Sequence, residues 1–153
     1  MQAYFDQMGQ LLADEKVPMD EAAKTSKVRM LVRARTKEVL WKLDPHRKRN
    51  LLQFLHEAGL IVGNNNIIGL IGADLREAYL KNLDLANVNL EGADMKKAQL
   101  SEADLHGAIL RGADLTNADL EGAYLTGAMV ADQQLAVCAS LEKVILPDGS
   151  VHD

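Results

Sequence analysis

The sequence predicts a β-solenoid that follows a helical N-terminal region, and two observations carry this prediction. An apolar residue, nearly always leucine, recurs every five positions between Leu70 and Val130 without a slip. A small or apolar residue stands two positions before each of these central residues. A helix, with a period of about 3.6, and a flat strand, with a period of 2, both fail to explain a period of five. Units this short cannot bury an apolar face alone, so they must stack on copies of themselves.

A second period of twenty residues indicates how many units make one coil. Gly72, Gly92 and Gly112 recur at that spacing. A corner where the chain turns sharply benefits from a residue without Cβ. The alignment therefore favours four five-residue units per coil, with the central residues stacked in inner ladders.

The repeat unit itself resembles that of a known family. Its pattern is Ala, then Asp or Asn, then Leu and two variable residues, as at residues 73–77 and 113–117. This pattern is similar to that of the pentapeptide-repeat proteins, and it covers a little under half of the chain. The resemblance implies a right-handed quadrilateral β-helix with four units per coil, here about three coils. It implies no particular activity, because most members of the family have none assigned.

We expect three segments along the chain, which are helical region 1–66, repeats 67–132 and tail 133–153. Their net charges are +3, −6 and −2, so the sign changes where the repeats begin. A solenoid exposes unpaired N–H and C=O groups at both of its ends. The first segment is therefore predicted to be an α-helical N-terminal cap, and the tail a C-terminal cap.

Apolar periodicity and punctuation predict the elements inside these caps. Helices are expected at residues 2–15, 26–43 and 45–58, the third with Asp44 as N-cap and Pro45 in the first helical position. Leu51, Leu52 and Leu55 of the third helix should rest on the first coil. After the repeats we expect a short helix within 131–140, a segment 141–146 lying across the last coil, and a turn at 147–149.

Composition excludes several classes of protein. The chain contains no run of about 18 apolar residues and no signal peptide, so we expect no membrane span and a cytoplasmic protein, or one at the cytosolic face of a membrane. Its single cysteine, Cys138, suits a reducing compartment. The four histidines are scattered, and Cys138 has no neighbouring base in sequence. We therefore expect no enzyme, no metal and no cofactor.

The acidic residues before the central leucines are the first candidate site. By the period of twenty, carboxylates stack in two columns, one of them beside a tyrosine: Asp74, Asp94 and Asp114, then Asp84 and Asp104 with Tyr124. One interpretation is a partner-binding surface. The family resemblance adds a sharper form, mimicry of DNA toward a DNA gyrase-type topoisomerase. The alternative is structural, because short polar side chains bond neighbouring backbone. Arg76 and Lys96 share the first column and partly neutralise it.

Basic residues form the second candidate site. Arg29, Arg33 and Lys37 recur every four residues along one helix, and residues 47–49 follow as Arg47, Lys48 and Arg49. Such a face binds anionic lipid or nucleic acid, or it is a solvated face near acidic surface of its own molecule. Lipid is favoured over nucleic acid because segments 2–8 and 33–36 resemble parts of larger, membrane-attached bacterial, notably cyanobacterial, pentapeptide proteins.

The sequence therefore predicts a non-enzymatic scaffold that presents rigid, flat faces to an unidentified protein partner. A peripheral membrane module is the alternative, and a gyrase-type DNA mimic is the third interpretation. Weak self-association is also expected, because each end of a short solenoid is a template for pairing.

Overall fold

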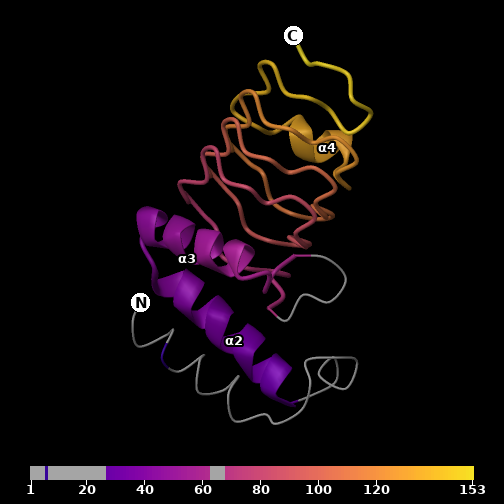
Figure 1. The fold of residues 1–153 in the computed structure, drawn as a ribbon. Helices are drawn as coiled ribbons and strands as arrows, with labels where there is room; N and C mark the ends of the chain where they lie inside the picture. Colours follow the sequence, from indigo (N-terminus) through magenta and orange to yellow (C-terminus); the bar gives the residue numbers. More distant parts are fainter. Residues whose placement is uncertain (1–5, 7–26, 63–67) are drawn as a thin grey trace.

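The structure is a computed structural model that describes residue 6 and residues 27–62 and 68–153. Within 27–62, side chains are described from residue 30 on. The expected helix at 2–15 lies outside the described residues except for Asp6. The helices run in the order α2 (Lys27–Lys42), α3 (Pro45–Glu57) and α4 (Asp132–Leu135). Figure 1 shows α2 and α3 at one end of a stack of coils and α4 toward the other end.

The two longer helices begin and end within one residue of their predicted bounds. The Asp44 side chain accepts a hydrogen bond from the backbone N–H of Arg47 at 2.9 Å, which satisfies one of the free donors of the first turn of α3. Pro45 follows in the first turn, and Gly59 adopts a left-handed conformation with φ of 67° just after the last turn. These predictions are confirmed.

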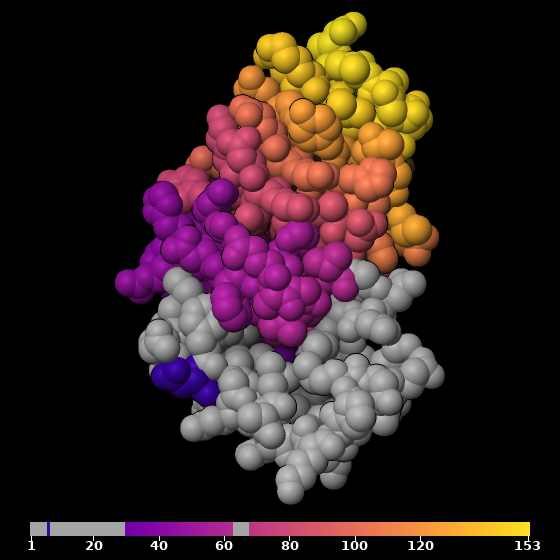
Figure 2. Space-filling view, viewed as in Figure 1, coloured from indigo at the N-terminus to yellow at the C-terminus, as the bar shows by residue number. Residues whose placement is uncertain are grey.

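Isolated parallel bridges join residues that are twenty apart, such as Asp74 to Asp94 and Asp94 to Asp114. The N–H of Leu75 donates to the carbonyl of Asp94 at 2.8 Å, and the N–H of Asp94 donates back to the carbonyl of Ala73 at 2.9 Å. The chain therefore passes beside itself after every four five-residue units, although the described residues contain no extended strand. The result is a β-solenoid, in which the colours of Figure 2 follow the sequence along the stack.

The interior is a ladder of apolar side chains. The central residues from Leu70 to Leu125 and the residues two before them are buried, as predicted, and Val130 is half-buried. Leu51, Leu52 and Leu55 of α3 are fully buried in the same cluster as the first coil. The helices and the coils thus share one continuous core.

Gly72, Gly92 and Gly112 lie in one column of corners, as predicted, and the other corners adopt the same conformation. The second residue after each central residue from Leu70 to Leu125 has a left-handed backbone, with φ between 57° and 69°, whether or not it is glycine. The non-glycine members of this set within the repeats are Glu77, Asn82, Asn87, Lys97, Glu102 and Asn117. The left-handed turn aligns the corner N–H with the next coil, as in the 2.9 Å bond from Glu77 to the carbonyl of Lys96. This bonding pattern favours the conformation at every corner.

The prediction that segment 141–146 lies across the last coil is corrected by the structure. Parallel bridges join Asp119 to Ser140 and Tyr124 to Ile145, at a spacing of 21, so this segment stacks as a further coil. The four-residue α4 replaces one unit and accommodates the extra residue. An antiparallel return then covers part of this coil, through a bridge between Ile145 and Val151. Its bonds include the Leu146 N–H to the Ser150 carbonyl at 2.8 Å.

Candidate functional site

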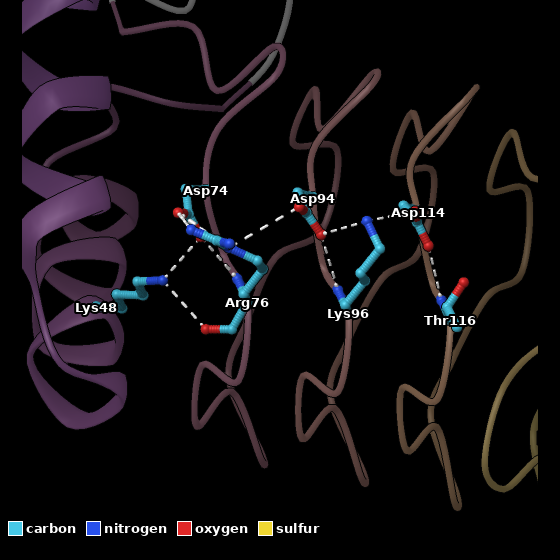
Figure 3. A network of polar contacts seen from close by, with 7 residues as sticks. All are labelled: Lys48, Asp74, Arg76, Asp94, Lys96, Asp114 and Thr116. Carbon is cyan, nitrogen blue, oxygen red and sulfur yellow. Dashed lines mark hydrogen bonds and ion pairs between the residues drawn. The ribbon is translucent and has the colours of Figure 1, made fainter.

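One column of carboxylates alternates with cations and forms what we call the paired face, shown in Figure 3. It consists of Asp74, Arg76, Asp94, Lys96 and Asp114, with Lys48 of α3 at its end. The Lys48 Nζ lies 3.0 Å from Asp74 Oδ1, and the Lys96 Nζ lies 3.4 Å from Asp94 Oδ1 and 2.7 Å from Asp114 Oδ2. Arg76 contacts Asp74 directly, and its Nε lies 3.9 Å from Asp94 Oδ2. The acidic charge predicted for this column is therefore neutralised within the molecule.

The ion pairs of the paired face lower the pKa of its aspartates. Burial of Asp74 acts to raise its pKa, but hydrogen bonds from Arg76 and Lys48 outweigh that effect and lower the pKa to about 2. The pKa of Asp114 is also lowered to about 2, first by the hydrogen bond from Lys96 and then by those from Thr116. Both groups are carboxylates at neutral pH.

The structural interpretation of the acidic residues is confirmed at the level of the backbone. Each aspartate accepts a hydrogen bond at Oδ1 from the backbone N–H two residues later, which steadies the turn that follows. The donors are Arg76 for Asp74 at 3.1 Å, Ala86 for Asp84 at 3.0 Å, Lys96 for Asp94 at 3.3 Å, His106 for Asp104 at 2.9 Å and Thr116 for Asp114 at 3.1 Å. This role accounts for a short acid at these positions without any partner.

The basic residues of α3 lie against the outer edge of the first coil. Lys48, which is only 5% exposed, donates to the carbonyl of Arg76 at 3.1 Å in addition to Asp74. Arg49 donates to the carbonyls of Tyr79, at 3.4 Å, and Lys81. The Tyr79 N–H in turn donates to the carbonyl of Pro45 at 3.4 Å. Lys48 is thus buried in contacts within the molecule, and the half-buried Arg49 also bonds the first coil, while the lipid or nucleic-acid role of these residues stays a prediction.

The remaining basic candidates do not share the hydrogen bonds of Lys48 and Arg49. Arg47 is exposed and pairs with Asp44, with 3.3 Å between Nε and Oδ2. Arg33 lies against Gly69, and Lys37 extends toward Gly72. Arg29 belongs to α2, but its side chain is outside the described part of the chain. The structure therefore divides the predicted basic surface into separate environments.

The second acidic column forms an open face made of Asp84, Asp104 and Tyr124, which consecutive bridges join. The Asp84 side chain is 61% exposed and Tyr124 is 49% exposed. A shallow hollow of about 280 Å³ is lined by these three residues with Asn82, Leu83 and Glu102. A second hollow of about 300 Å³ shares Asn82, Leu83 and Asp84 and extends to α3. The open face is thus a surface on which carboxylates share a shallow hollow with an aromatic ring.

Sequence reasoning missed part of this open face. The His56 Nε2 of α3 lies 3.3 Å from Asp84 Oδ1, and Lys81 pairs with Glu102 at 3.3 Å. Asn82 and Glu102 are twenty residues apart, so the period of twenty applied to the corners would have placed them together. No sequence signal could have found His56, because its position depends on how α3 packs.

The described residues offer little for covalent chemistry. Cys138 is half-buried, its thiol donates to the carbonyl of Gln134 at 3.5 Å, and burial raises its pKa to about 11. A thiol that stays protonated at neutral pH is a poor nucleophile. Within the described ranges, no three histidine, cysteine or acidic side chains gather closely enough to hold a metal ion. In the same ranges, no helix has the length and apolar character needed to cross a membrane.

Comparisons with known proteins give matches to the repeats that form the coils. A family model for pentapeptide repeats matches residues 73–112 and 98–130, with eight copies. A search of curated proteins found no match. Among the solved structures, the chain is similar to a pentapeptide-repeat protein of the Arabidopsis thaliana thylakoid lumen. The identity is 29%, the match covers 51% of this chain and 61% of that one, and the TM-score is 0.22.

A second solved structure is HetL of Nostoc sp. strain PCC 7120, a pentapeptide-repeat protein involved in regulating heterocyst differentiation. The identity is 22%, with 56% of this chain and 62% of that one covered and a TM-score of 0.20. This chain thus matches less than two thirds of the length of either protein. The TM-scores are too low to support any detailed comparison of shape. The five-residue repeat, the coil bonding and the family model together show that residues 73–130 consist of pentapeptide repeats.

Proposed function

We propose that this protein is a non-enzymatic scaffold whose open face binds a protein partner. The observation that carries this proposal is the contrast between its two acidic columns. Asp74, Asp94 and Asp114 are occupied by the molecule's own cations, whereas Asp104 and Tyr124 have no cationic side chain paired with them among the described residues. Of the two columns, the open face is therefore the one with carboxylates that remain available.

The proposed architecture is a right-handed quadrilateral β-helix with a cap at each end. The bridges at a spacing of twenty support four sides per coil. Segment 1–66 would be the N-terminal cap, supported by the bonds of Lys48 and Arg49 to edge carbonyls. Segment 67–132 would hold the family repeats, and segment 133–153 a C-terminal cap that begins with one further coil. A capped stack of this kind would hold its faces rigid.

The chemistry of the open face indicates the kind of partner. An exposed tyrosine ring attracts a cation placed over it, and the carboxylates in the same column add charge-assisted hydrogen bonds. Asp84 and Asp104 lie next to each other in one bridged column with Tyr124. The proposed partner is a folded protein that presents arginine or lysine side chains to this hollow.

The test is affinity capture from a lysate of the source organism, quantified with purified partner once it is identified. The altered chain carries Asp104→Lys and Tyr124→Ala, and Asp94→Asn on the paired face is the matched control. We expect the first variant to lose the partner and the control to retain it. A partner that binds both variants equally, or no specific partner at all, would contradict the proposal.

The remaining alternatives are not adopted as the main function. DNA mimicry requires a continuous acidic column, and Arg76 and Lys96 interrupt the longer one. An assay of gyrase supercoiling at high protein excess tests this alternative directly. Lipid binding could not use the buried Lys48 in its present position, so it would depend on the cations of α2 and on the more exposed Arg47 and Arg49.

A further inference from the structure

The four cations of α2 whose side chains the structure describes fall into two pairs. Arg35 and Lys42 both contact Glu38, at 3.2 and 2.7 Å. In contrast, the side chains of Arg33 and Lys37 form no hydrogen bond or ion pair in the described structure. They lie one turn apart on the helix, so their side chains project from the same face.

These two cations converge on the beginning of the first coil. A Cβ added to Gly69 would lie 3.0 Å from the Arg33 Nε, and one added to Gly72 would lie 3.2 Å from the Lys37 Nζ. Each cation therefore rests directly on glycine backbone, at two positions three residues apart. The glycines leave space that a side chain would occupy.

The Arg33 Nε is buried and has no acceptor. A buried N–H donor without an acceptor is unfavourable, and it is more so when the group is charged. An anionic oxygen placed between the two side chains would accept from the guanidinium and pair with the ammonium. Phosphate suits this geometry because it offers several oxygens and enough charge for two cations.

We infer that Arg33 and Lys37 form a binding site for a phosphate group at the junction of α2 and the first coil. The source is a phosphate ester in solution or the headgroup of an anionic lipid. The lipid source is included because Met30, 73% exposed, and Trp41, 65% exposed, lie on the same stripe of α2 as Lys37. Exposed apolar side chains next to cations are typical of helices at a bilayer surface. This site is independent of the open face.

The experiment uses the full chain and two probes. Inorganic phosphate is titrated by calorimetry against a chloride background of equal ionic strength. Vesicles of phosphatidylcholine with and without phosphatidic acid are then used in co-sedimentation. Arg33→Gln and Lys37→Gln are compared with Arg35→Gln, which removes the same kind of charge from the same helix but from the pair with Glu38.

We expect Arg33→Gln and Lys37→Gln each to weaken binding at least about tenfold, and Arg35→Gln to change it by less than about twofold. Because Arg33 is half-buried, its variant is checked for folding by circular dichroism, and the exposed Lys37 provides the second test. Binding of inorganic phosphate with this pattern assigns a soluble ligand. The same pattern with phosphatidic acid vesicles alone assigns a lipid. Binding to neither probe, or equal loss in all three variants, would overturn the inference.

Discussion

The paired face and the open face are built from the same repeat, yet they leave their carboxylates in different states. The aspartates of both columns stand before a central apolar residue, and both sets use Oδ1 to accept a backbone N–H two residues later. The difference lies in the residue that donates this N–H. On the paired face the first two donors are Arg76 and Lys96, and on the open face they are Ala86 and His106. A cation there reaches the aspartate of its own coil and that of the next coil.

The comparison shows that the aspartates of a column do not by themselves determine whether the column is free to bind a partner. The residue two positions later decides whether the column stabilises the stack or remains free for a partner. On the paired face the column also extends into α3 through Lys48, so the same charges that join the coils hold the helix. The predictions below test this division of roles, from the largest expected effect to the smallest.

A substitution in the core beneath both faces should cause the largest loss of stability. Leu105 is fully buried between the stacked Leu85 and Leu125. Leu105→Ala removes buried methyl groups and leaves a cavity that the coils cannot close, so it should lower the free energy of unfolding by about 2–5 kcal/mol. Urea unfolding followed by circular dichroism measures this loss. A loss under about 0.5 kcal/mol would contradict the inward position of Leu105.

Removing the cation at the end of the paired face should have the next largest effect. Lys48→Ala leaves Asp74, whose side chain is 14% exposed, without its buried partner, and removes the donor to the Arg76 carbonyl. We expect a loss of about 2–3 kcal/mol in the free energy of unfolding, somewhat below the range for fully buried pairs.

The matched control for Lys48 is Lys81→Ala on the open side. Lys81 and Glu102 form an ion pair in which both side chains are more than half exposed. Its loss should change stability by less than about 0.5 kcal/mol, because solvent screens exposed pairs. Equal effects of the two substitutions in urea unfolding would mean that Lys48 does not anchor α3.

The paired face should also make stability depend on acid. The pKa values of Asp74 and Asp114 are lowered to about 2, below the value of about 4 of an unfolded chain. Their contribution is therefore complete above pH of about 4 and is lost as the pH falls toward about 2. The double variant Asp74→Asn with Asp114→Asn should reduce the change in melting temperature with pH in this window.

The control for the acid effect is Tyr124→Phe, which alters the open face without removing a carboxyl group. It should leave the pH dependence of the melting temperature as in the parent chain. If the double variant kept the full slope between pH of about 4 and 2, the acid sensitivity would have to come from other groups.

Much of this architecture could be predicted from sequence because the repeat is local and regular. The spacing of Leu85, Leu105 and Leu125 is enough to place them in one ladder, and Asp44 with Pro45 is enough to start α3. The same spacing placed Asp84, Asp104 and Tyr124 in one column.

The remaining features depend on packing between segments that are far apart in sequence. In the sequence, Lys48 and Arg49 belong to a basic run that is typical of a solvated helix face. The packing of α3 against the first coil buries Lys48 and brings both side chains to backbone carbonyls. The extra coil after Val130 was missed because α4 interrupts the period and shifts the stacking from 20 to 21 residues. A strict five-residue pattern cannot detect such an insertion.

The smallest expected effect concerns the corners that follow the two faces. The corner column after the paired face has no glycine and contains Lys97 with φ of 57°, whereas the column after the open face contains Gly127 with φ of 69°. A left-handed conformation costs a residue with Cβ about 1–2 kcal/mol. Glycine avoids this cost, but it loses about 0.4–1 kcal/mol more conformational entropy on folding. The balance favours glycine slightly at either corner.

Lys97→Gly should therefore raise the free energy of unfolding by about 0.5–1 kcal/mol, and Gly127→Ala should lower it by a similar amount. Space is not a factor at Gly127, because a Cβ there would meet no atom within 4 Å. Both corner N–H groups bond to the next coil, at 3.0 Å for Lys97 and 2.9 Å for Gly127, and neither substitution removes that bond. Urea unfolding of the two variants isolates the backbone conformation as the cause. If Lys97→Gly were destabilising, the lysine side chain would have to contribute more than its strained backbone costs, and the paired face would then extend to its corner.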